Sequence, residues 1–87
     1  MSVLITRKFA DGGFGTRDER AQCDCIEYEV LKAGEHLSVT ITDQEIGGGW
    51  YRLWLDGDDA ADAARAALAT ASSNGVVNGF SIINTNE

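Results

Sequence analysis

The sequence predicts a two-layer α+β sandwich, in which one alanine-rich helix packs on one face of an antiparallel sheet of about five strands. Two patterns support this prediction. Apolar and polar residues alternate in several short segments, as in half-buried strands, and one later segment consists mainly of alanine and aspartate. The order of these segments is β-β-β-β-α-β. Because 87 residues leave room for one hydrophobic core, residues 1–87 are expected to form a single domain.

The first third of the chain contains two alternating segments. Residues 2–9 predict a first strand, although Leu4 breaks the alternation. Residues 11–22 are rich in glycine and then in charge, which indicates a loop. Residues 26–30 alternate apolar side chains with glutamates and predict a second strand.

The middle of the chain predicts two more strands. A turn at residues 32–35 leads to a third strand at 37–42, and we expect the second and third strands to form a hairpin. Residues 43–49 end in three glycines and indicate a loop. Residues 50–55 are aromatic-rich and predict the fourth strand.

The last third predicts the helix and a closing strand. A helix is expected over about residues 58–72, with Asp56 or Asp58 as its N-cap and Gly75 as its stop signal. Residues 76–83 predict the fifth strand. The expected core residues are Ile26, Leu37, Val39, Ile41, Leu53, Leu55 and Leu68.

The chain is acidic, with a net charge of −7. Residues 21–64 contain ten acidic and two basic residues, a net charge of −8. Such a surface repels phosphate backbones, so we expect no direct nucleic-acid binding but a protein partner with a basic surface. The alternative is that the charge only keeps a small domain soluble. No apolar stretch approaches the roughly 20 residues of a membrane span, so the expected compartment is the cytoplasm.

No motif in the sequence predicts catalysis, a cofactor or a metal ion. Cys23 and Cys25, with the single histidine His36, provide fewer than the four ligands of a structural zinc site. Two small, partly buried thiols are expected, and a site shared between two chains stays open. The glycines at 12–15 lack the lysine that follows in a P-loop, and the acids at 56–62 are explained by helix capping.

The fourth strand carries the strongest candidate site. Because side chains alternate along a strand, Trp50, Arg52 and Trp54 share one face, and Tyr51, Leu53 and Leu55 share the other. The leucine face suits the helix, which leaves the tryptophans and arginine on the open face. These residue types are enriched in interface hot spots. We expect Glu27 and Glu29 to project onto the same side. Alternatively, the tryptophans only cover the sheet.

The segment from Trp50 to Ile83, a strand followed by an aspartate-capped alanine-rich helix and a closing strand, resembles that of some small phage-encoded inhibitors called anti-CRISPR proteins. The resemblance lies in the general character of the chain: short, acidic and without a catalytic motif. It implies inhibition by binding, for example of a nuclease complex whose basic surfaces contact nucleic acid.

The sequence therefore predicts a non-enzymatic protein-binding domain, with inhibition of a nucleic-acid-handling complex as its most specific form. The partner-binding residues are predicted to be Trp50, Arg52, Trp54, Glu27 and Glu29. A homo-oligomeric structural protein, which pairs through the open sheet face, is the alternative.

Overall fold

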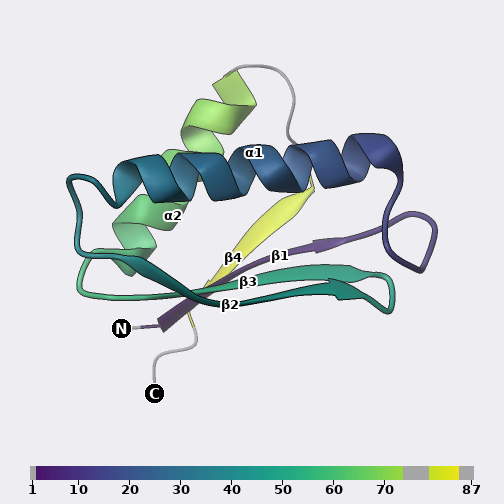
Figure 1. Cartoon of the computed structure of the whole chain (residues 1–87), viewed down its shortest axis with the longest axis horizontal. Coiled ribbons are helices and arrows are strands. Elements are labelled where there is room, and N and C mark those ends of the chain that lie inside the picture. The colour runs from purple at the N-terminus through teal and green to yellow at the C-terminus, as the bar shows by residue number, and fades with distance from the viewer. Residues whose placement is uncertain (1, 74–78, 85–87) are drawn as a thin grey trace.

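The computed structural model describes residues 2–73 and 79–84 (Figure 1). Its elements follow in the order β-α-β-β-α-β. They are β1 (Ser2–Lys8), α1 (Arg17–Ala33), β2 (Thr40–Gly47), β3 (Trp50–Asp56), α2 (Ala60–Ser73) and β4 (Phe80–Asn84).

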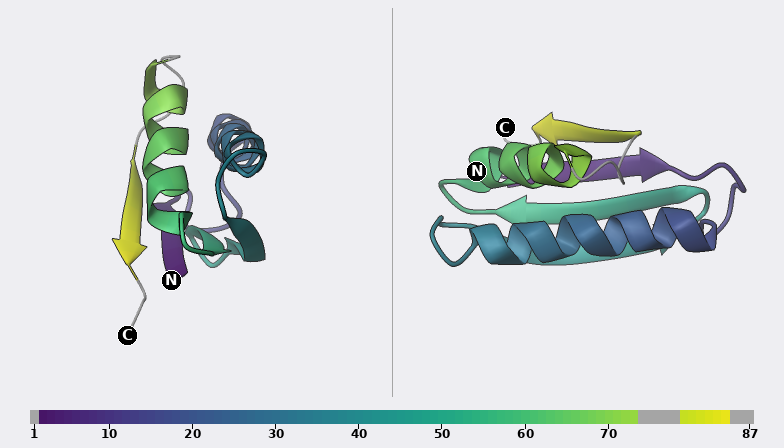
Figure 2. Two further views of the ribbon diagram at one scale, coloured as in Figure 1. Left: turned by 90° about the vertical axis from the view of Figure 1, so that its left-hand side faces the viewer. Right: turned by 90° about the horizontal axis from the view of Figure 1, so that it is seen from above.

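The four strands form one antiparallel sheet in the order β2-β3-β1-β4. Each helix connects two strands that have a third strand between them, so the chain forms two interlocked split βαβ units, the ferredoxin-like arrangement. Both helices lie on the same face of the sheet and pack against each other (Figure 2). The predicted α+β class and antiparallel sheet are confirmed. The prediction of five strands and one helix is wrong, because the described residues form four strands and two helices.

Helix α1 occupies residues that the alternation assigned to a loop and a strand. Thr16 is its N-cap: the Thr16 hydroxyl accepts from Glu19 N at 3.2 Å, and the Glu19 carboxylate accepts from Thr16 N at 2.8 Å. This capping box satisfies two backbone donors at the start of the helix. The loop predicted at 11–22 therefore ends at Thr16, and residues 17–22 belong to the helix.

The strand predicted at residues 26–30 is wrong because the apolar positions there follow a helical period. Cys23, Ile26 and Val30 are fully buried and lie on one helix face, at spacings of three and four residues. Tyr28, which the alternation placed beside Ile26, is 61% exposed. The hairpin predicted between the second and third strands therefore does not form.

The hairpin of this fold joins β2 to β3 instead. The predicted strand at 37–42 begins only at Thr40, and most of the predicted loop at 43–49 belongs to β2, because its residues pair in register with β3. A bulge at Thr42 interrupts that register. Gly48 and Gly49 form the turn, with φ of 62° and 87°, a region that glycine adopts without a side-chain clash.

The later elements agree better with those predicted from the sequence. The fourth predicted strand is β3, and the predicted helix is α2, shifted by about two residues. Asp59, rather than Asp56 or Asp58, immediately precedes α2, and its carbonyl accepts from Ala63 N at 2.8 Å. The closing strand is β4; the N-terminal part predicted for it at 76–78, and the stop signal at Gly75, lie outside the described residues.

The core lies between the sheet and the two helices. Of the predicted core residues, Ile26, Leu53 and Leu55 are fully buried. Val39, Ile41 and Leu68 are partly buried against the core, and Leu37 is half-buried in the loop after α1. The remaining large core side chains come from three elements and the loop after β1: Val3, Ile5, Phe9, Val30 and Tyr51. None of the helices in the described segments is both long and apolar enough to cross a membrane.

Candidate functional site

The sheet face opposite the helices, called the open face below, carries the predicted site. Tyr51, Leu53 and Leu55 are fully buried on the helix side of β3. Trp50 is 36% exposed, and Arg52 and Trp54 are half-buried on the other side. The predicted division of this strand into two faces is therefore correct.

An apolar row crosses the open face from β3 to β4. Trp54 lies opposite Leu4 of β1, which lies opposite Ile83 of β4. Directly opposed side chains in an antiparallel pair are in contact distance. Ile83 is 47% exposed, and Trp54 and Leu4 are half-buried. Three neighbouring strands thus present one continuous apolar strip to solvent.

Arg52 is held in place at the centre of this face. Its guanidinium lies 5.5 Å from the centroid of the Trp50 ring and 3.2 Å from Glu45 Oε1 on β2. The ion pair is exposed and contributes little to stability, but together the two contacts orient the arginine. Arg52 keeps about a third of its side chain exposed, so its remaining N–H donors are accessible to a partner.

The rim of the open face carries both signs of charge. Lys8 lies opposite Trp50, Asp43 lies opposite Trp54, and Glu45 lies opposite Arg52. The apolar strip is thus bordered by a basic residue on β1 and by two acidic residues on β2, the edge strand. A rim of this kind sets the orientation of a bound partner more than its affinity.

Glu27 and Glu29 do not lie on the open face, and the prediction that they project beside the tryptophans is wrong. Both belong to α1, because residues 26–30 are helical. The Glu27 carboxylate accepts a 2.7 Å hydrogen bond from the Tyr51 hydroxyl and a second one from the Gln44 amide, on the helix side of the sheet. Glu29 is half-buried beside α2.

Sequence reasoning missed Leu4 and Ile83 as members of this face. Leu4 gave a signal, since it breaks the alternation of the first strand in the way that an apolar residue on a solvent-facing side does. Ile83 gave none, because its position beside Leu4 depends on the register between β1 and β4.

The residues considered as metal ligands, Cys23, Cys25 and His36, differ in their burial. Cys23 is buried in α1, Cys25 is half-buried, and His36 is exposed in the turn after the helix. Burial raises the pKa of the Cys23 thiol to about 12, so this thiol stays protonated at neutral pH. Among residues 2–73 and 79–84, no group of three or more histidine, cysteine, aspartate or glutamate residues is arranged to hold a metal ion.

The glycine-rich loop after β1 is held by hydrogen bonds, although Phe14 within it is 65% exposed. The Asp11 carboxylate accepts from Gly13 N at 2.9 Å and from Gly15 N at 3.2 Å. Gly13 O accepts from Gly49 N at 2.9 Å, which attaches the loop to the β2–β3 turn. The backbone donors that a phosphate would need are therefore partly used within the loop.

Comparison with known proteins adds no family to this description. No protein-family model matches the sequence, and no curated protein matches it at a significant level.

Proposed function

We propose that this chain is a non-enzymatic protein-binding domain that contacts its partner through the open face. The observation that carries the proposal is the apolar row of Trp54, Leu4 and Ile83, with Trp50 and Arg52 beside it, on the sheet face that the helices leave uncovered. A tryptophan–arginine cluster next to a continuous apolar strip has the composition of an interface hot spot.

The charge of the chain favours a partner with a basic surface. Ten acidic residues lie between residues 21 and 64, and the net charge of the whole chain is −7. A basic surface that normally contacts nucleic acid fits this charge, so we include inhibition of a nucleic-acid-handling protein, as in anti-CRISPR proteins, in the proposal. The expected compartment is the cytoplasm.

Affinity capture with matched variants tests the proposal. Wild type, Trp54→Ala and Tyr28→Ala are immobilised and exposed to a lysate of the source organism, after circular dichroism has confirmed that all three fold. Tyr28 is the control because it is 61% exposed on α1, on the opposite side of the sheet. A protein retained by wild type and Tyr28→Ala, but lost from Trp54→Ala, supports the proposal. Equal retention by all three contradicts it.

Self-association through the open face is the second candidate. The apolar row of Trp54, Leu4 and Ile83 can pack against the same row of a second copy across a two-fold axis. Lys8 and Asp43 provide opposite charges at the rim of the same face. Sedimentation velocity separates the two candidates: a wild-type dimer that Trp54→Ala converts to a monomer, and that persists in high salt, supports the homo-oligomer. A monomeric wild type supports the partner-binding proposal.

A further inference from the structure

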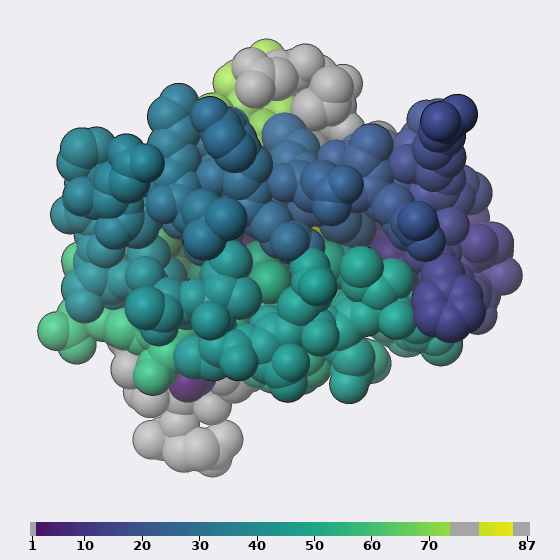
Figure 3. Space-filling view, viewed as in Figure 1, coloured from purple at the N-terminus to yellow at the C-terminus, as the bar shows by residue number. Residues whose placement is uncertain are grey.

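The side of the molecule where α1 lies over β2 carries a second surface, separate from the open face. A groove of about 380 Å³ lies there, called the α1–β2 groove (Figure 3). It is lined by Val30, Leu31, Gly34, Glu35, Val39, Thr40 and Ile41.

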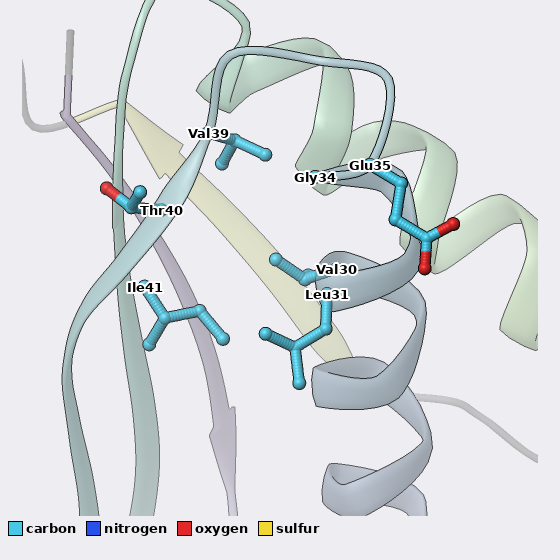
Figure 4. A pocket seen from close by; sticks show the side chains of 7 residues that line it. All are labelled: Val30, Leu31, Gly34, Glu35, Val39, Thr40 and Ile41. Carbon is cyan, nitrogen blue, oxygen red and sulfur yellow. The ribbon is translucent and has the colours of Figure 1, made fainter.

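The walls of this groove are mainly apolar. Figure 4 shows Leu31 of α1 and Ile41 of β2 on opposite walls, with Val30 on the helix wall, Val39 near the start of β2, and the Glu35 carboxylate turned away from the groove. Leu31 is 64% exposed, so most of its side chain is open to solvent at the groove wall. An apolar side chain from outside would bury this leucine and the outer part of Ile41.

The edge of the sheet continues from the groove. Within the part of the chain that the structure describes, β2 pairs with β3 alone, so its outer side presents backbone N–H and C=O groups to solvent. The bulge at Thr42 separates the groove end of the strand from a regular run over residues 43–47. An added strand can pair with that run while its end reaches the groove.

The charge around the edge is negative. Glu35 lines the groove, and Asp43 and Glu45 lie on β2. Neither Glu35 nor Asp43 forms an ion pair among the described residues. The Asp43 carboxylate accepts a 2.8 Å hydrogen bond from Gln44 N but has no cationic partner among the described residues, so it favours a lysine or arginine side chain on a strand that pairs with β2.

We propose that the α1–β2 groove and the outer edge of β2 bind an extended, basic peptide segment of a partner protein. The segment adds to the sheet as a strand next to β2 and places an apolar side chain between Leu31 and Ile41. Backbone hydrogen bonds along residues 43–47 supply affinity. The groove selects an apolar side chain, and Asp43 and Glu45 on the other face of β2 select basic residues beside it. The groove lies on the helix side of the sheet, whereas Asp43 and Glu45 also border the open face. The proposal does not depend on the function proposed for the open face.

A second copy of the chain suits this edge less well. Antiparallel pairing of β2 with β2 of another copy would bring Asp43 and Glu45 close to the same acids of that copy. Like charges on paired strands are destabilising, and each chain has a net charge of −7.

Fluorescence anisotropy with short synthetic peptides tests the proposal. The probe is a labelled nine-residue peptide of alternating lysine and valine. The first reference peptide has the same sequence with every backbone nitrogen methylated, and the second has glutamate in place of lysine. We expect saturable binding of the probe, and at least tenfold weaker binding of each reference peptide, because one lacks strand donors and the other carries the wrong charge.

Two protein variants complete the test. Leu31→Ala, on the exposed side of a helix where alanine is well tolerated, should weaken probe binding at least fivefold without lowering the melting temperature. Ile83→Ala, on β4 at the opposite edge of the sheet, should bind the probe as wild type does, so loss of partner capture in that variant reports on the open face alone. No saturable binding of the probe, equal binding of the methylated peptide, unchanged binding by Leu31→Ala, or a dimer that uses this edge would each overturn the proposal.

Discussion

The Tyr51 hydroxyl donates a 2.7 Å hydrogen bond to Glu27 Oε2, and so joins β3 to α1 across the core boundary. Burial, with the Glu27 carboxylate beside it, raises the pKa of the Tyr51 phenol, so the phenol remains the donor at all ordinary pH values. The Gln44 side-chain amide donates to the same carboxylate oxygen from β2. One glutamate therefore connects the helix to two strands.

Removing the Tyr51 hydroxyl should destabilise the domain. Tyr51→Phe keeps the buried ring but leaves the partly buried Glu27 carboxylate with one donor fewer, and we expect the free energy of unfolding to fall by about 1–2 kcal/mol in urea titrations. Tyr28→Phe is the matched control, since Tyr28 is exposed and should show no change. Identical midpoints for both variants would mean that this hydrogen bond contributes nothing.

The free energy of unfolding should fall at acid pH, because Glu19 becomes protonated there. Hydrogen bonds from the backbone N–H groups of Thr16 and Ala10, with Arg7 at 3.6 Å, hold the pKa of the Glu19 carboxyl below its ordinary value. Because the folded-state pKa is lowered, this stabilisation is present above the unfolded value of about 4.3 and is lost as pH falls through the folded-state pKa.

Urea titrations of Glu19→Gln check this pH dependence. The variant should be less stable than wild type at pH 7, and the difference should shrink toward pH 3, where Glu19 itself is neutral. Glu35→Gln, at an exposed position, is the control and should match wild type at both pH values. A difference that is the same at pH 7 and pH 3 would exclude the charge of Glu19 as its cause.

Gly57 should tolerate no side chain. Its φ is 130°, and a Cβ there would lie 2.3 Å from Ser38 O, because the β3–α2 connection packs directly against the loop before β2. Gly57→Ala should cost at least about 1–3 kcal/mol from backbone strain alone. Gly13→Ala, where the nearest atom would be 3.9 Å away, should stay within about 0.5 kcal/mol of wild type. Equal melting temperatures of the two variants would contradict the packing described for Gly57.

The two cysteines should react at different rates. Cys23 is 1% exposed and its thiol pKa is raised to about 12, whereas Cys25 is half-buried. Iodoacetamide at pH 8 should therefore label Cys25 first and Cys23 only after unfolding in urea. Peptide mass spectrometry during the reaction measures both rates. Faster labelling of Cys23 in the native protein would show that α1 is not packed as described.

The sequence by itself determined the α+β class, strand β3 with its two faces, and helix α2. In residues 50–55 a period of two is unambiguous. One face carries two tryptophans and an arginine, and the other carries a tyrosine and two leucines. Residues 26–30 satisfied both periods, since Ile26 and Val30 lie two alternations apart and also one helical turn apart. The capping box of Thr16 and Glu19 is a local sequence signal for a helix start. The alternation in residues 26–30 predicted a strand in spite of it.

Only the tertiary structure decided the rest of the candidate surfaces. Residues 43–45 are polar and have no strand pattern of their own; they are extended because β3 offers them a register of hydrogen-bond partners. Leu4 and Ile83 join Trp54 only through the pairing of three strands that are distant in sequence. Glu27 meets Tyr51 only because α1 packs over the sheet. Local side-chain patterns specify a segment's own conformation, whereas contacts between segments depend on register and packing, which no single segment encodes.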